Sequence, residues 1–109
     1  MVIALKCIDE GGDYGILASL DNAKGTTIFL TDTNWKCSSV EEVGWKLPGF
    51  EDSSGNWQSA SKIADHGAHP WYDKAAAISH DADWIWAVGA GSKSTVYCRG
   101  IVKGTFLKF

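Results

Sequence analysis

The chain has 109 residues, of which 45% are apolar, and its net charge is −3. This length suits one domain with a genuine core better than two, so we expect residues 1–109 to form a single domain. Acidic and basic residues are interspersed without a basic stripe, which argues against nucleic acid as a partner. No apolar run approaches the ~18 residues of a membrane span, so membrane insertion is not expected.

Apolar runs separated by turn residues predict three strands in the first third of the chain. They are 2–8 (VIALKCI), 14–20 (YGILASL) and 26–31 (TTIFLT). The connections are short and contain glycine, aspartate or asparagine, which favours antiparallel neighbours. We therefore expect these three strands to form a meander.

The rest of the chain alternates between one long irregular segment and further strands. Residues 41–81 lose periodicity but stay rich in tryptophan, which predicts an ordered loop packed on the domain, with a single helical turn at 74–79. Strands are expected at 35–40 (WKCSSV), 84–88 (WIWAV), 94–102 (STVYCRGIV) and 105–109 (TFLKF). In the segment 84–88, Trp84, Trp86 and Val88 should share one face. With almost no helix, the fold class is all-β, an antiparallel β-sandwich.

Three cysteines, Cys7, Cys37 and Cys98, leave an odd count without a CxxC pair. Either all three are buried free thiols, or one disulfide leaves a third cysteine over. The segment MVIALKCIDEGG lacks the basic start and cleavage site of a signal peptide. The sequence thus predicts a soluble protein made in the cytosol, with export to the cell surface or exterior as the alternative.

The stretch DHGAHPWYD at 65–73 concentrates two of the three histidines, two carboxylates and two aromatic rings. His66 and His69 would share a helical face, but Gly67 and Pro70 make a helix there unfavourable. Zinc takes three or four protein ligands, and only one other histidine exists. The pattern therefore indicates a polar loop rather than a zinc site.

Nothing in the sequence predicts an enzyme. There is no nucleophile elbow and no Cys–His pair with an evident orienting group. The adjacent carboxylates Glu51 and Asp52 diverge in an extended segment, and Asp81 and Asp83 suit turn and capping roles. The expected function is non-catalytic.

A calcium site is a second reading of the acidic turns. In a meander, alternate turns lie at the same end of the sheet, so Asp9 and Asp13 would share an end with Asp32. Carboxylate oxygens from two adjacent loops are the ligands that Ca²⁺ prefers. The alternative is that these residues serve only as turn formers.

Sugar binding is the third chemistry that the loops suggest. An aromatic ring covers the apolar face of a pyranose while polar groups bind its hydroxyls. Trp45 and Trp71 are the candidate rings, with Asp65, His66 and His69 as polar partners. The alternative is that each loop tryptophan packs over the edge of the sandwich. The tryptophans in strand segments, expected in the core, are Trp35, Trp84 and Trp86.

Several short motifs occur in order along most of the chain. They are YGILA at 14–18, WKCS at 35–38, GW at 44–45, FEDSS at 50–54, HG at 66–67 with PW at 70–71, ADWIW at 82–86 and VYCR at 96–99. This set resembles galactose-binding-like (jelly-roll) lectin modules, here in truncated form and with Gly55 and Asn56 interrupting the usual run into tryptophan. Small calcium-dependent hemagglutinins of plasmodial slime moulds look similar. The resemblance implies a jelly-roll fold and carbohydrate binding, with calcium as a candidate cofactor.

The partners expected on this basis are glycans or glycoproteins. A sandwich without its outer strands exposes edges that pair with other chains, and a hemagglutinin must be at least bivalent. We therefore expect a homo-oligomer. The alternatives are a non-catalytic protein-interaction or structural β-sandwich module, and an appended domain of a glycoside hydrolase.

Overall fold

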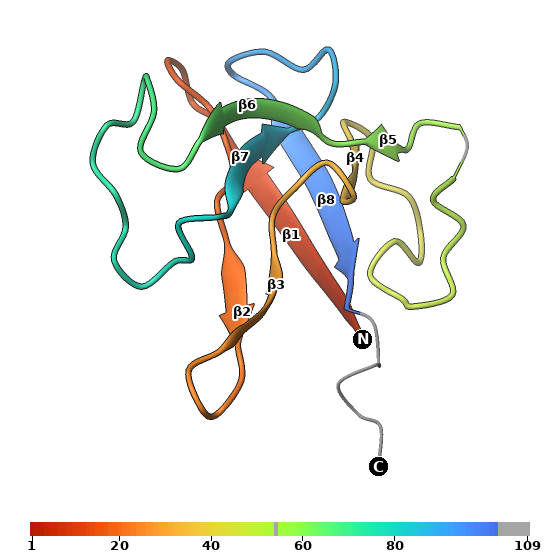
Figure 1. The fold of residues 1–109 in the computed structure, drawn as a ribbon. Coiled ribbons are helices and arrows are strands. Elements are labelled where there is room, and N and C mark those ends of the chain that lie inside the picture. The colour runs from red at the N-terminus through yellow and green to blue at the C-terminus, as the bar shows by residue number, and fades with distance from the viewer. Residues whose placement is uncertain (54, 103–109) are drawn as a thin grey trace.

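The computed structural model describes residues 1–53 and 55–102, and within them the chain is all-β (Figure 1). The strands are β1 (Val2–Ile8), β2 (Ser19–Asp21), β3 (Thr27–Leu30), β4 (Lys36–Ser38), β5 (Gln58–Ser59), β6 (Ser61–Asp65), β7 (Asp83–Trp86) and β8 (Thr95–Ile101). No helix that could cross a membrane occurs in this part of the chain. The strand predicted at 105–109 lies outside the described residues.

The strands form three antiparallel sheets. One has four strands in the order β1-β8-β4-β5, and the other two are the pairs β2-β3 and β6-β7. An isolated bridge between Ile16 and Ile85 connects the segment before β2 to β7. The predicted N-terminal meander is therefore wrong for its first strand. The antiparallel pairing of its second and third strands is confirmed, although β2 begins at Ser19 rather than at residue 14. β1 pairs along its whole length with β8, from Val2↔Ile101 to Ile8↔Thr95. Both strands have seven residues, whereas β2 has three, so β8 offers β1 a much longer ladder.

Two further predictions for the middle of the chain need correction. The segment at 41–81 is not one loop, because β5 and β6 lie within it. The sequence of β6, SKIAD, lacks a buried alternating face, so its strand character carries no hydrophobic signal. At 74–79 there is a hydrogen-bonded turn, in which the Ile78 amide donates to the Ala75 carbonyl (3.1 Å), and no helix.

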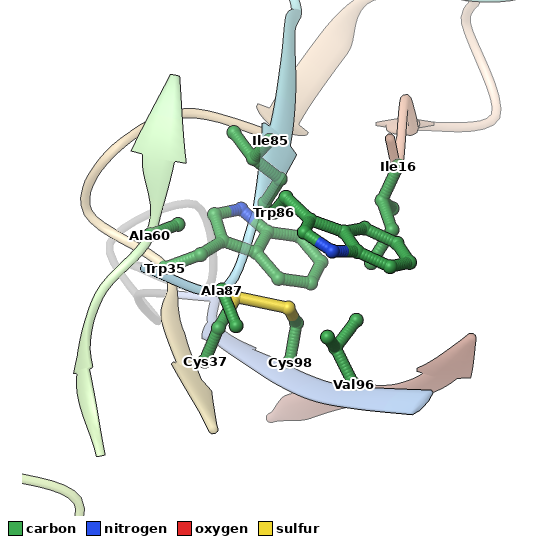
Figure 2. Packing of buried hydrophobic residues seen from close by; sticks show 9 residues of the cluster. All are labelled: Ile16, Trp35, Cys37, Ala60, Ile85, Trp86, Ala87, Val96 and Cys98. Carbon is green, nitrogen blue, oxygen red and sulfur yellow. A yellow bond between two sulfur atoms is a disulfide. The ribbon is translucent and has the colours of Figure 1, made fainter. Parts of the chain in front are cut away.

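The main core lies between the four-stranded sheet and β7, with the Trp35 and Trp86 rings at its centre (Figure 2). The buried members are Ile16, Trp35, Cys37, Ala60, Ile85, Trp86, Ala87, Val96 and Cys98. β7 ends at Trp86, and Val88 is 56% exposed, so the predicted face shared with Trp84 does not extend to Val88.

A disulfide joins Cys37 and Cys98 beneath the tryptophan rings (Figure 2). The two residues are directly opposite each other in the β4–β8 ladder, with Cα atoms 4.1 Å apart. Cys7 is a free cysteine, and partial burial raises the pKa of its thiol. Of the two alternatives for the cysteines, one disulfide with one cysteine left over is therefore correct.

β8 is buried on both faces. Val96 and Cys98 point into the main core, while Tyr97 packs on the other side with Trp45 and Trp57 of the β4–β5 connection. Layers on both sides of a four-stranded antiparallel sheet are compatible with a β-sandwich.

Arg99 fastens the β4–β5 connection to β8. Arg99 is only 2% exposed. Its guanidinium donates hydrogen bonds to the Trp45 carbonyl (2.9 Å), the Leu47 carbonyl (2.6 Å) and the Asp52 carboxylate. A buried guanidinium requires such partners because an unpaired charge in an apolar region is costly. The connection is therefore held at its backbone as well as by its two tryptophan rings.

Candidate functional site

The segment between β6 and β7 folds back so that Trp71 lies flat on Trp84. The ring centroids are 4.0 Å apart and the planes differ by 20°. Both rings press on the backbone at Gly15, where a Cβ atom would stand 2.8 Å from Trp84 Cε3 and 3.0 Å from Trp71 Cη2. Only glycine allows this close approach. One face of Trp71 is thus held in place by a second aromatic ring.

A cavity of about 280 Å³ opens beside this stack. It is lined by Asp13, Tyr14, Ile63, His69, Pro70 and Trp71. These residues come from the turn after β1, from β6 and from the segment that follows β6. The cavity therefore combines two aromatic rings with one carboxylate and one imidazole.

The polar side chains of the cavity are accessible. Asp13 and His69 are both exposed, and His69 Nδ1 lies 3.1 Å from the Tyr72 hydroxyl, itself on a side chain that is 70% exposed. Carboxylate, imidazole and phenol groups beside an aromatic wall are suited to binding hydroxyl groups.

His66 has a different role from the one predicted. It is buried, and its Nε2 accepts a hydrogen bond from the Ala75 amide (2.9 Å). The proton must therefore be on Nδ1, which donates to the Ser79 carbonyl (3.0 Å). With both nitrogens engaged by the backbone, His66 anchors the β6–β7 connection and has no free nitrogen for a sugar or a metal.

Two other predicted sugar contacts also lie outside the cavity. Asp65 is exposed and pairs with Lys62 Nζ at 2.6 Å. The hydrogen bond to Asp65 is the main cause that raises the pKa of Lys62, and the charge of Asp83 is the second. Trp45 is only 3% exposed and stacks on Trp57 against the other face of the four-stranded sheet. Of the five predicted residues, the structure brings His69 and Trp71 together and leaves Trp45, Asp65 and His66 elsewhere.

The three residues predicted as calcium ligands do not converge. Asp9 accepts hydrogen bonds from the amides of Gly11 (3.1 Å) and Lys93 (2.9 Å), and Asp32 accepts one from the Asn34 amide (2.8 Å). Asp13 lines the cavity. Within residues 1–53 and 55–102 there is no group of three or more histidine, cysteine, aspartate or glutamate side chains that could hold a metal. The described carboxylates therefore do not fit the shared site that the meander would have created.

The sequence patterns do not predict that Tyr14 and Asp13 line the cavity. They indicate a strand at Tyr14 and a calcium site at Asp13, and neither residue is near His69 or Trp71 in the sequence. The one local signal was Gly15, because a glycine inside a predicted strand often marks the close approach of another group. The identity of that group depends on long-range packing.

Comparison with known proteins gives no match for this chain, whether with family models, with curated sequences or with solved structures. The resemblance to galactose-binding-like modules thus rests on the sequence motifs alone.

Proposed function

We propose that this protein is a non-catalytic carbohydrate-binding lectin that recognises glycans through the cavity beside Trp71. The observation that supports this most is the cavity lining, which places two aromatic rings next to an exposed carboxylate and an exposed imidazole. A pyranose presents the complementary surface, one apolar face and a rim of hydroxyl groups.

The stack of Trp71 on Trp84 favours binding because it holds the ring before a ligand arrives. A ring already packed at 4.0 Å from its neighbour loses little conformational freedom when a sugar is added. His69 and Asp13 would bind hydroxyl groups at the rim. The volume of about 280 Å³ is small among ligand pockets and fits one terminal sugar of a glycan better than a long oligosaccharide.

The same lining supports a role without catalysis. Glycoside hydrolysis commonly uses a pair of carboxyl groups flanking the bond that is cleaved. Among the described residues that line the cavity, Asp13 supplies a single carboxylate. Binding is therefore the chemistry for which the cavity is equipped.

Two further expectations accompany the proposal. Calcium dependence remains a prediction. The described carboxylates do not offer a shared site for the ion. Location at the cell surface or exterior is favoured by the buried disulfide, because disulfides persist mainly in oxidising compartments. Glycans and glycoproteins are the partners available there.

A glycan array tests the proposal directly. The unaltered protein should bind a defined set of glycans, and Trp71→Ala should weaken binding by at least about tenfold. Val43→Ala, which changes a fully exposed side chain on a different loop, is the control and should bind as the unaltered protein does. Absence of binding to any glycan would refute the proposal. Binding that persists in EDTA would remove the calcium prediction alone.

A protein-interaction module is the second candidate, and one surface favours it. Val43 is 102% exposed and Leu47 is 61% exposed on a loop that encloses a hollow of about 520 Å³. Exposed apolar side chains around a hollow commonly mark protein contacts. An empty glycan array, together with partner binding that Val43→Glu abolishes, would favour this function over the lectin.

A further inference from the structure

The outer edge of β1 carries a regular row of backbone groups that bond to no other strand in the described part of the chain. The Asp9 amide donates to the Ser94 carbonyl (2.9 Å), and the Val102 amide donates to the Met1 carbonyl (2.8 Å). In an antiparallel ladder, alternate residues direct both backbone groups to the same side. The odd-numbered residues of β1 therefore bond to β8. The even-numbered residues, which point to the opposite edge, are Val2, Ala4, Lys6 and Ile8.

Among residues 1–53 and 55–102, this edge has little of the usual protection against pairing. β1 ends the strand order of its sheet, and Figure 1 shows β8 beside it. No other strand pairs with β1 in the described part of the chain. Natural edge strands are blunted by shortness, proline, bulges or several charges. β1 has seven residues in unbroken register, no proline and one charged residue, Lys6.

An apolar groove adjoins the same edge. Its volume is about 230 Å³, and its β1 residues, Ile3 and Leu5, are odd-numbered and face the main core. The remaining lining comes from the β2–β3 pair and its neighbours: Ala18, Ser19, Leu20, Phe29, Leu30 and Trp35. Phe29 and Trp35 also lie over Gly100 of β8, so the groove lies on the face of the sheet that carries Ile3 and Leu5. A strand added at this edge would place its alternate side chains on that same face of the sheet.

We propose that a second copy of this chain binds here, by antiparallel pairing of β1 with the partner's β1 around a two-fold axis at Leu5. In this register all seven residues of the strand are paired: Val2 with Ile8, Ile3 with Cys7, Ala4 with Lys6, and Leu5 with its own copy. The two Lys6 side chains are kept apart, and each lies opposite a small alanine.

A second copy suits the edge better than an unrelated strand because the edge is complementary to itself. The even-numbered residues exchange backbone hydrogen bonds, and the odd-numbered apolar side chains of the two copies lie side by side on one face of the joined sheet. The contact is isologous, so it closes after two copies and joins two four-stranded sheets into one. This pairing does not rest on glycan binding, although two cavities on one dimer would add avidity.

Cysteine cross-linking tests the register. In a Cys7→Ser background, Leu5→Cys places two thiols across the axis in a non-hydrogen-bonded pair, where Cα atoms are about 4.5 Å apart. The Cys37–Cys98 disulfide of this protein spans a directly opposed pair at 4.1 Å. Mild oxidation should therefore give a covalent dimer. Lys6→Cys in the same background is the control, because its partner is Ala4 and its side chain points to the other face.

Proline substitution tests the edge itself. Ala4→Pro removes an amide that points outward and leaves the bonds to β8 intact, so the variant should keep its near-ultraviolet circular dichroism and weaken self-association by at least about tenfold. Sedimentation equilibrium measures the association. A monomeric unaltered protein, a dimer that Ala4→Pro leaves unchanged, or cross-linking of Lys6→Cys equal to that of Leu5→Cys would overturn the proposal. If Ala4→Pro does not fold, the comparison of cross-linking in Leu5→Cys and Lys6→Cys tests the proposal on its own.

Discussion

The two long connections of this protein both contain tryptophan but have opposite roles. The β4–β5 connection places Trp45 and Trp57 in a buried cluster against the four-stranded sheet. The β6–β7 connection leaves Trp71 partly exposed beside a cavity. A tryptophan in a loop is therefore not in itself a sign of ligand binding. What distinguishes the two is the element on which each connection rests.

The anchors explain the difference. The β4–β5 connection lies over the central strand β8 and is held by the buried guanidinium of Arg99. The β6–β7 connection begins and ends on a two-stranded pair and is held by the neutral side chain of His66. The first connection covers a sheet face and becomes core. The second lies at the margin, where one face of Trp71 is packed on Trp84 and its ring still borders a cavity.

Removing the Arg99 anchor should have the largest effect. Arg99→Met leaves the Asp52 carboxylate and two carbonyls without their partner, and we expect a loss of about 3–5 kcal/mol in the free energy of unfolding. Urea denaturation measures it. Lys36→Met, at the residue opposite Arg99 on β4, is the control and should change stability by less than about 1 kcal/mol. Equal losses in the two variants would contradict the assigned role.

Trp45→Ala should be nearly as damaging. Removing a fully buried tryptophan costs about 3–5 kcal/mol in general, and we place this variant near 3 kcal/mol because the loop can partly collapse. The folded fraction should bind glycans with unchanged affinity, because the cluster around Trp45 shares no residue with the lining of the Trp71 cavity. If fully folded Trp45→Ala protein bound glycans more weakly than the unaltered protein, the Trp45 cluster and the Trp71 cavity would not be independent.

His66→Phe tests the anchor of the second connection. The phenyl ring fills the space but leaves the Ala75 amide and the Ser79 carbonyl unsatisfied, so we expect a loss of about 2 kcal/mol. Hydrogen exchange at the Ala75 amide should accelerate more than exchange in β8. His80→Phe alters the ring that packs edge-on against His66 and is the control. If the Ala75 amide exchanges at the same rate in both variants, His66 is not the anchor.

Trp71→Ala should reverse the pattern seen with Trp45→Ala. The ring is already partly exposed, so the loss of its stack on Trp84 should cost about 1–2 kcal/mol. Glycan binding should fall while the melting temperature changes modestly. A loss of stability as large as that of Trp45→Ala would mean that Trp71 mainly plugs the core.

Gly15→Ala should give the smallest change in stability. The added methyl group meets Trp84 at 2.8 Å and Trp71 at 3.0 Å, so one ring must move by a fraction of an ångström. We expect a cost of about 1 kcal/mol and a severalfold loss of glycan affinity. Tryptophan fluorescence reports the displaced rings, and an unchanged spectrum would show that the stack tolerates the methyl group.

The parts of the fold that were predicted correctly carry their signal locally. The runs that became β1, β3 and β8 are apolar and bounded by turn residues, so their strand character follows from composition. The polar strand β6 was missed, because it is defined by pairing with β7 rather than by its own hydrophobicity. The meander was wrong for the same reason: the partner of β1 lies at the other end of the described chain.

The sequence by itself determined that the chain is all-β, that Trp35 and Trp86 belong in the core and that glycine and proline make 66–73 a loop. These outcomes depend on residue type and short-range periodicity. Only the tertiary structure decided that Cys37 bonds to Cys98, that Trp45 is buried while Trp71 borders a cavity, and that Asp13 and His69 share that cavity. Those outcomes depend on which distant segments pack together, and no local pattern records that choice.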